Sequence, residues 1–511
     1  MGDIIAGYEY DWAAVQFRDQ PALIFGDTVH TYSQVDGRAN QLAHGLIGLG
    51  LQRGARVAVL LNNSVESLET VIGVAKAGLV FVALNARHAG PEHAEILADC
   101  DVEAIIAGPE FEALAPVLSV NGQLIGLGWG DLTYENLLSA QPDHPPRLLI
   151  DENALVRIAY TSGTTGRPKG IAYSIRRLKA RYDNFFAALE YRLGPKDSMI
   201  HVGPLTHAAG NYLLPYYLRG ARNVILPRFD PELVLRTVEA ERITHLFLVP
   251  TMLIRLLDHL DTGTSYDLSS LCIINYGTAP TPVPVIQRAL ARFGPILRQH
   301  FGMSECPQPL TLLYPDDHLI PEKLASCGRP TLNLRIEIKG QDGQRLGPDE
   351  VGEIAIAAHG VADVAYWQRP DLLAEAVKDG WLMTGDLGRI DHDGFLFIVG
   401  RNKEMIISGG FNVYSREVED ALFRVKGVAD AAVFGLPDDQ WGEIVAAAIV
   451  LQPGKIPDAA TVTAGLNDLI AGYKKPREIF FLRELPRNLA GKVDKGALKA
   501  LTSHKKGGDV K

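Results

Sequence analysis

The stretch NVILPRFDPELVLRTVEAERITHLFLVP, residues 223–250, places one amphipathic segment between two short β-rich runs. Asp230 is positioned to cap a helix, Pro231 suits its first position, and Glu232 lies in its first turn. The apolar runs on either side predict buried strands. A strand, a helix and a strand in succession predict parallel sheets covered by helices, with loops at the strand ends free to bind ligands.

The same alternation continues on both sides of this stretch. Further β-rich runs are RVAVLL (56–61), SMIHVGP (198–204) and LCIIN (271–275). In PVPVIQRALARF (282–293), the apolar side chains of Ile286, Leu290 and Phe293 fall on one helical face. The predicted fold class is therefore α/β.

Length and composition predict a folded protein of more than one domain. The chain has 511 residues, of which 47% are apolar and 22% are charged, and a single core of this size is uncommon. The composition changes to short elements after GFLFIVGR (394–401), so we expect a large domain over 1–401 and a small one over 402–511. The prolines of QPDHPPR (141–147) predict a linker, and the tail HKKGGDVK (504–511) is expected to be disordered.

Charge and cysteine content exclude several classes of protein. A net charge of -10 disfavours non-specific nucleic-acid binding, which needs a basic surface. The four cysteines are scattered without C-x-x-C spacing, so they predict neither a zinc site nor a disulfide framework. The amino terminus lacks the pattern of a signal peptide, and the most apolar stretch (77–84) is too short to span a bilayer. We expect a cytoplasmic protein without a transmembrane segment.

The loop YTSGTTGRPKG, residues 160–170, has the composition of a phosphate-binding loop. Its glycines can turn backbone N–H groups inward, and its hydroxyl groups and lysine add donors and positive charge. The spacing differs from that of a Walker A loop, because Gly170 follows Lys169. A polar β-hairpin turn is the alternative interpretation.

This loop resembles the signature loop of the adenylate-forming superfamily, which includes acyl-CoA synthetases, peptide-synthetase adenylation domains and luciferases. Further segments resemble that family's motifs in the same order: YGTAP (276–280), QHFGMSE (299–305), TGDLGRID (384–391), GRNKEMIISGG (400–410) and NLAGKVDK (488–495). The resemblance covers essentially the whole chain. It implies a large N-terminal domain of parallel sheets layered with helices, with a β-rich subdomain, and a small mobile α+β C-terminal domain.

The resemblance implies that ATP, Mg²⁺ and CoA take part. The residues implied to hold the ATP phosphates are Thr161, Ser162, Gly163, Thr164, Thr165 and Lys169. Glu305 matches the magnesium-ligating glutamate, a role that one carboxylate can fill when phosphate oxygens complete the shell. With Lys492, the residues Glu305, Thr161 and Lys169 are implied to be catalytic.

The remaining nucleotide contacts are implied by the other motifs. Residues matched to the adenine and α-phosphate sites are Gly277, Thr278, Ala279, Pro280, His300, Phe301, Gly302 and Ser304. Phe301 stands where the family commonly has tyrosine, and its ring can still stack on adenine. Asp386, Arg401 and Ile398 are matched to the ribose and phosphate site, where a carboxylate can accept hydrogen bonds from two hydroxyl groups.

Three features of the small domain matter to the implied mechanism. Lys492 matches the lysine that bridges the substrate carboxylate and the α-phosphate, two anions that otherwise repel each other. Lys403 matches the hinge about which the domain rotates between half-reactions. Gly409 and Gly410 match the pair lining the pantetheine tunnel of CoA, although a plain turn is an equal alternative.

The expected activity is ATP-dependent formation of an acyl adenylate with release of pyrophosphate, followed by transfer to CoA. The implied acyl pocket consists of His207, Gly210, Tyr212, Tyr276, Gly277, Gly302 and Cys306. This mostly apolar or aromatic lining suits a fatty, alicyclic or aromatic acid. An amino acid is disfavoured, because no acidic residue lies between Gly203 and Arg228 to pair with an amino group.

Two other classes remain open. The acyl group could be loaded onto a carrier protein instead of CoA, or the chain could be a regulatory relative without catalysis. The expected partners are small molecules, with a homodimer as an open alternative.

Overall fold

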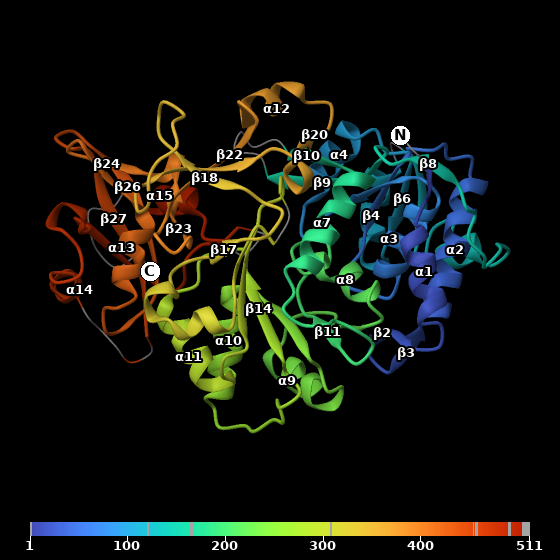
Figure 1. Cartoon of the computed structure of the whole chain (residues 1–511), viewed down its shortest axis with the longest axis horizontal. Coiled ribbons are helices and arrows are strands. Elements are labelled where there is room, and N and C mark those ends of the chain that lie inside the picture. Colours follow the sequence, from blue (N-terminus) through green and yellow to red (C-terminus); the bar gives the residue numbers. More distant parts are fainter. Residues whose placement is uncertain are drawn as a thin grey trace.

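The computed structural model describes residues 3–119, 122–162, 168–306, 309–452, 454, 458–488 and 492–502. In Figure 1 the blue amino-terminal elements lie at one end of the long axis and the orange and red carboxyl-terminal elements lie at the other. Two large mixed sheets are built from strands within residues 21–366, and two smaller sheets from strands within residues 336–401 and 406–482. The predicted α/β class is confirmed.

A seven-stranded sheet has the strand order β20-β10-β9-β5-β4-β6-β7. Its strands are β4 (Arg56–Leu60), β5 (Val80–Ala83), β6 (Ala104–Ala107), β7 (Gln123–Gly126), β9 (Leu155–Ser162), β10 (Pro168–Ser174) and β20 (Ala365–Tyr366). One face packs on α2 (Tyr32–Gly48), α3 (Glu66–Lys76) and α6 (Tyr134–Leu138), and the other packs on α4 (Gly90–Asp99) and α5 (Ala115–Leu118). The short strand β1 (Asp3–Ile5) precedes α1 (Tyr8–Gln16) and pairs antiparallel with β8 (Leu149–Asp151).

A nine-stranded sheet has the order β17-β16-β15-β14-β13-β11-β12-β2-β3, and β15 through β2 are parallel. Its strands are β2 (Pro21–Phe25), β3 (Thr28–Thr31), β11 (Ser198–His201), β12 (Arg222–Ile225), β13 (His245–Leu248), β14 (Ile273–Gly277), β15 (Leu297–Phe301), β16 (Thr311–Leu313) and β17 (Arg329–Pro330). Helices α9 (Pro231–Ala240), α10 (Pro250–Leu260) and α11 (Val283–Phe293) cover one face, whereas α7 (Ile175–Ala187) and α8 (Gly210–Tyr217) cover the other.

The strand, helix and strand expected over residues 223–250 are confirmed. The Asp230 carboxylate accepts a hydrogen bond from the Leu233 amide at 3.0 Å and so caps α9. Ile286 of α11 is buried against the sheet, with Leu290 and Phe293 packed on the same cluster. Local capping and periodicity therefore identified these helices correctly.

The predicted linker at 141–147 does not separate two sheets. β9 and β10 follow the linker but join β5 in the seven-stranded sheet, and β2 precedes it but pairs with β12. The prolines lie in a surface connection, and each large sheet contains strands from both sides of it.

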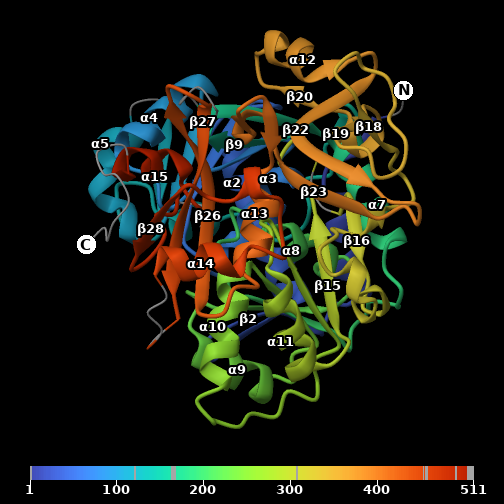
Figure 2. The ribbon, with the colours of Figure 1, turned by 90° about the vertical axis from the view of Figure 1, so that its left-hand side faces the viewer.

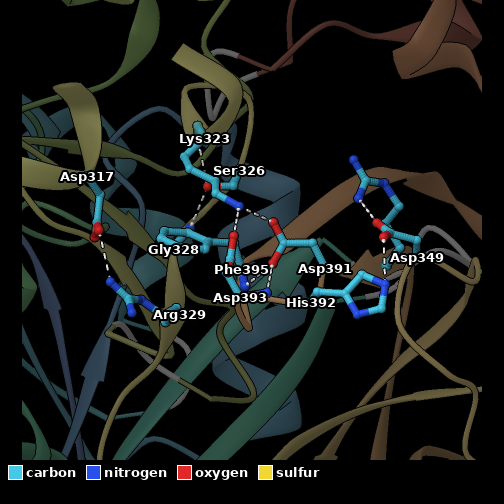
Figure 3. Close-up of polar contacts among 11 residues, drawn as sticks. Asp317, Lys323, Ser326, Gly328, Arg329, Asp349, Asp391, His392, Asp393 and Phe395 are labelled. Carbon is cyan, nitrogen blue, oxygen red and sulfur yellow. Dashed lines mark hydrogen bonds and ion pairs between the residues drawn. The ribbon is translucent and has the colours of Figure 1, made fainter. Parts of the chain in front are cut away.

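A third sheet is antiparallel and contains β18 (Ile336–Lys339), β19 (Gly352–Ala357), β21 (Val377–Lys378), β22 (Trp381–Ile390) and β23 (Leu396–Arg401), with α12 (Pro370–Ala376) before β21. This sheet matches the expected β-rich subdomain. Figure 3 shows the contacts between Lys323, which precedes this sheet in the sequence, and the turn that connects β22 to β23. Lys323 Nζ lies 2.7 Å from Asp391 Oδ2 and 2.6 Å from Asp393 Oδ2, and the other Asp391 oxygen accepts from the backbone amides of Asp393 and Phe395. The last residue of the 384–391 motif is therefore structural.

The final sheet has the order β25-β24-β27-β26, with β28 paired to β27. Its elements are β24 (Ile406–Ser408), β25 (Phe411–Val413), α13 (Ser415–Leu422), β26 (Val428–Asp438), β27 (Gly442–Leu451), α14 (Ala459–Gly465), β28 (Glu478–Leu482) and α15 (Lys495–Thr502). It has a core of its own, built from α13 and the inner faces of β26 and β27. In Figure 2 these elements face the viewer in front of the amino-terminal part.

Short 3₁₀ turns complete the connections: η1 (Pro109–Leu114), η2 (Asp316–Leu319), η3 (Pro321–Lys323), η4 (Gly360–Ala362), η5 (Asn402–Glu404) and η6 (Gly472–Lys474). Within the part of the chain that the structure describes, no helix is long and apolar enough to cross a membrane. The tail 504–511 lies outside the described residues.

Candidate active site

Both large sheets change winding direction at one strand, and the loops after those strands meet. β11 lies between β12 and β13, and β4 lies between β5 and β6. Ligands of open α/β sheets bind beyond the carboxyl ends of strands at such points. Asn63, after β4, donates to the carbonyls of Gly203 and Leu226 and accepts from the Leu205 amide at 3.0 Å. The topology therefore places a candidate site between the two sheets.

The predicted phosphate loop connects two antiparallel strands. Thr161, one residue before the end of β9, lies opposite Lys169 of β10, and Pro168 pairs with Ser162. The loop is thus carried by a hairpin, as the alternative interpretation held, and a hairpin does not exclude phosphate binding. Residues 163–167, which include Gly163, Thr164 and Thr165, lie outside the described residues, as does the Ser162 side chain.

The loop after β15 packs against the same hairpin. Tyr173 of β10 donates its hydroxyl to the Ser304 carbonyl, and Arg177 donates to the Glu305 carbonyl. The Arg177 guanidinium stacks 4.3 Å from the centre of the Tyr173 ring. Tyr366 of β20 donates to Glu305 Oε1 at 3.3 Å, and Tyr366 itself pairs with Ile171 of β10. Glu305 therefore lies beside the strand that carries Lys169.

Sequence reasoning missed the three residues that hold this loop, Tyr173, Arg177 and Tyr366. Tyr173 and Arg177 lie more than a hundred residues from the loop that they contact, and Tyr366 lies about sixty residues from it. Nothing in the local pattern of either segment signals such pairing. The one signal in the sequence was the presence of aromatic residues, Tyr173 and Tyr366, in two strands that prove to be adjacent.

Asp386, Arg401 and Lys492 form one charged group. Asp386 and Arg401 face each other across β22 and β23, with Arg401 Nε 3.2 Å from Asp386 Oδ1. Burial raises the pKa of Asp386, and Arg401 and Lys492 oppose that rise. Desolvation lowers the pKa of Lys492, Arg401 lowers it further, and Asp386 and Glu404 oppose the change. The structure thus brings the predicted adenylation lysine to the predicted ribose site.

The turn after β14 is constrained by its backbone. A Cβ on Gly277 would lie 2.2 Å from the His300 carbonyl oxygen, so no side chain fits there. Thr278 has a positive φ of 72°, which is uncommon for a residue other than glycine. Arg416 of α13 donates to the Thr281 carbonyl at 3.4 Å, so the carboxyl-terminal part contacts this turn. The turn that includes Ala279 and Pro280 therefore lies at the junction of the two parts.

Phe301 and Ile398 pack on one apolar cluster, together with the strands of the antiparallel sheet. Their half-buried side chains come from β15 and β23, the strands that precede Gly302 and end at Arg401. The structure thus brings these two predicted nucleotide contacts together.

The predicted acyl pocket is only partly assembled. His207 lies in the loop after β11, where burial lowers its pKa. Gly210 begins α8, and a Cβ there would lie 1.9 Å from the Leu205 carbonyl oxygen. Tyr212 is fully buried on α8, with its ring 5.0 Å from that of Phe247. These residues cover the face of the nine-stranded sheet that carries Gly277.

Two residues of the predicted acyl pocket, Tyr276 and Cys306, lie away from His207, Gly210 and Tyr212. Tyr276 points to the opposite face of the sheet, where its hydroxyl bonds to His318 Nε2 at 2.8 Å, because successive strand residues alternate between faces. Cys306 is buried in the core beside the antiparallel sheet, and burial raises its pKa to about 12. His300, expected at the nucleotide, turns its ring toward Tyr212 at 5.6 Å.

The predicted tunnel glycines form the two-residue turn of the β24–β25 hairpin. Gly409 and Gly410 have φ values of 57° and 80°, as a type I′ turn requires. A Cβ on Gly409 would lie 2.5 Å from the Trp441 ring. The hairpin itself therefore needs both glycines. Lys403, the predicted hinge, is exposed in η5, which connects β23 to β24.

The residues present fit a magnesium ion that is shared with phosphate groups. Glu305 is half-buried beside β10 and offers one carboxylate. No group of three metal-ligating side chains occurs among the described residues, so a site here depends on ligand oxygens, as Mg²⁺ commonly does.

The candidate site therefore gathers loops that follow strands of the large sheets, and the carboxyl-terminal part contacts one of them through Arg416. Residues 10–367 match the AMP-binding enzyme family, and residues 417–492 match the C-terminal domain of AMP-binding enzymes. The chain belongs to this family, the adenylate-forming enzymes.

Named relatives extend over nearly the whole chain. It is 35% identical to the medium/long-chain-fatty-acid–CoA ligase FadD8 of Mycobacterium tuberculosis, covering 96% of this chain and 88% of that protein. It is 36% identical to a feruloyl-CoA synthase of an Amycolatopsis species, covering 96% and 98%. The solved structure of the amide bond synthetase McbA from Marinactinospora thermotolerans matches with a TM-score of 0.88 and 31% identity, covering 97% and 100%.

Proposed function

We propose that this protein is an AMP-forming acyl-CoA synthetase, which converts a carboxylic acid to an acyl adenylate and then to an acyl-CoA. The observation that carries the proposal is the ion pair between Asp386 and Arg401, 3.2 Å apart, with Lys492 close enough to act on both electrostatically. In this proposal, a lysine from the carboxyl-terminal part acts at the nucleotide site of the amino-terminal part. Its relatives, named as CoA ligases for fatty and feruloyl groups, support the same reaction class.

In the first half-reaction the acid carboxylate attacks the α-phosphate of ATP. Lys492 approaches both anions and reduces their repulsion, while Asp386 holds the ribose hydroxyl groups. The hydroxyl groups and the lysine of the β9–β10 hairpin stabilise the negative charge that develops on pyrophosphate. Mg²⁺ bound by Glu305 would neutralise further phosphate charge.

In the second half-reaction a CoA thiolate attacks the acyl carbonyl, a thioester bond forms, and AMP leaves with the bonding electron pair. We propose that the part after Lys403 rotates to present the Gly409–Gly410 hairpin to the site. The exposed η5 connection at Lys403 and the separate core of the last sheet support this rotation.

The acid is proposed to be aromatic rather than a long aliphatic chain. Tyr212 and Phe247 pack ring to ring on the acyl side of the sheet, and His300 lies against the same tyrosine. A flat aromatic ring can stack on such side chains. We also propose that the enzyme works in the cytoplasm, and the homodimer remains a prediction.

The test is a panel of carboxylic acids scored for pyrophosphate and AMP, with and without CoA. The expected result is acid-dependent pyrophosphate release and a thioester that forms only with CoA. No pyrophosphate with any acid would reject the activity. A requirement for a carrier protein, or product formation with amines alone, would reject CoA as the acceptor.

A further inference from the structure

The face of the nine-stranded sheet beneath α7 and α8 is polar although it is buried. Its side chains alternate with the apolar residues of the other face along each strand. The buried polar residues on this face are His201, Asn223, His245, Asn275, Arg298 and His300. Burying polar groups is costly unless they find hydrogen-bond partners.

Arg298 is the unusual member. It is 1% exposed, and its Nε donates to Asn275 Oδ1 at 2.9 Å. Its Nη2 is buried without a hydrogen-bond partner, and among the described residues no carboxylate forms an ion pair with it. The guanidinium also stacks on the Tyr191 ring, 5.8 Å from its centre, so Nη2 is the part of this buried cation that has no hydrogen-bond acceptor.

His300 supplies the complementary group. Asn275 Oδ1 is an acceptor that already receives the Arg298 bond, so His300 Nε2, 2.9 Å away, must donate to it. Burial lowers the pKa of His300 well below its usual range, so the ring is neutral and its Nδ1 carries no proton. That Nδ1 is a buried acceptor without a partner in the described chain.

These two groups lie deeper than the reaction centre. His300 pairs with Gly277 at the end of β14, and Arg298 pairs with Asn275 one two-residue step earlier. Each such step is about 7 Å along a strand, so Arg298 lies further from the strand end than His300. Tyr212, whose buried hydroxyl also lacks a partner, covers them from α8.

We propose that Arg298 and His300 recognise a hydroxyl group at the far end of an aromatic acid substrate. The hydroxyl oxygen accepts from Arg298 Nη2, and its proton is donated to His300 Nδ1. A second carboxylate at this position of the substrate can only accept hydrogen bonds, so it would leave His300 Nδ1 without a donor. This inference rests on the proposed acid-activating function and specifies its substrate class.

The experiment compares benzoate with 4-hydroxybenzoate, and cinnamate with 4-hydroxycinnamate, by kcat/KM for acid-dependent pyrophosphate release. The wild-type enzyme is expected to favour the hydroxylated member of at least one pair by about tenfold to a hundredfold, the value of one hydrogen bond to a charged group. Arg298→Met should reduce that ratio to near one, mainly through KM of the hydroxylated acid. Terephthalate is expected to be a poor substrate.

Tyr212→Phe and Tyr217→Phe form a matched pair. Both tyrosines are fully buried on α8, and both hydroxyls lack partners, but Tyr217 packs on Tyr32 away from Arg298. Tyr212→Phe should lower the hydroxyl preference, and Tyr217→Phe should leave it unchanged.

Equal use of both members of each pair, a preference for terephthalate, or the same ratio in Arg298→Met would overturn the proposal. Pyrophosphate release with any acid of the panel still supports the synthetase function, so the two failures are distinguishable.

Discussion

The two faces of the nine-stranded sheet differ in what they bury. The face beneath α9, α10 and α11 is almost entirely aliphatic, with Leu246, Ile274 and Leu297 in its centre. The face beneath α7 and α8 carries three histidines, two asparagines and an arginine at comparable burial. The strands are the same, so the difference is not one of strand propensity.

The aliphatic face needs only complementary shape, and it is stabilised by removal of apolar surface from water. The polar face gains less from this effect, because only some of its residues, such as Met199 and Phe247, are apolar, and several of its polar atoms have no partner among the described residues. A protein retains such groups where a ligand or water completes them. The comparison therefore assigns stability to one face and acid recognition to the other.

Truncation on the aliphatic face should cause the largest loss of stability. Ile274→Ala removes a fully buried side chain, and we expect the free energy of unfolding to fall by about 2–5 kcal/mol. Urea unfolding measures this change. The relative kcat/KM values across the acid panel should stay as they are, and a changed acid preference would contradict the division between faces.

Asn275→Ala tests the polar face. It leaves Arg298 Nε and His300 Nε2 without their acceptor, which should cost about 1–3 kcal/mol of unfolding free energy. The hydroxyl preference should fall with it.

Asn223→Ala is the matched control on the same face. Asn223 is equally buried and bonds to His201 at 2.8 Å, at the far side of the sheet. It should show a similar loss of stability with no change in acid preference. If both variants changed acid preference equally, the pocket could not be assigned to the Arg298 end.

Acid conditions should weaken the polar face through His245. Burial lowers the pKa of His245 to about 3, whereas an unfolded histidine takes up its proton near pH 6.5. Between these values the unfolded state binds more protons, so stability falls as pH is lowered, by about 1.4 kcal/mol per pH unit for this residue. Unfolding of His245→Asn measured between pH 6.5 and 4.5 should show a shallower decline than the wild type. Identical slopes would show that His245 is not buried as a neutral ring.

Much of this architecture was predictable from the sequence. The cap at Asp230 and the helical face of Ile286 are local signals, and local signals identified their elements. The residues Asp386, Arg401 and Lys492 were found by motif, and the structure brings them together. Such residues can be found from the sequence because the same chemistry uses the same short motifs across the family.

The rest depends on orientation and on distant partners. Tyr276 was assigned to the acyl pocket, but its position in the strand directs it to the other face. Cys306 was assigned there too, but the chain turns away after Glu305 and buries it elsewhere. The alternation of Arg298 and His300 within LRQHF was visible in the sequence, yet only the pairing of β14 with β15 shows that Asn275 joins them.

In the proposed mechanism, one site activates the acid with Lys492 and releases the thioester without it. The most direct test measures the two half-reactions of Lys492→Ala separately. Acid-dependent pyrophosphate release should fall at least about a hundredfold, as expected when one preorganised charge is removed from the transition state. Conversion of a presynthesised acyl adenylate to acyl-CoA should continue at a rate close to that of the wild type. Equal loss of both half-reactions, or pyrophosphate release at the normal rate, would contradict the account.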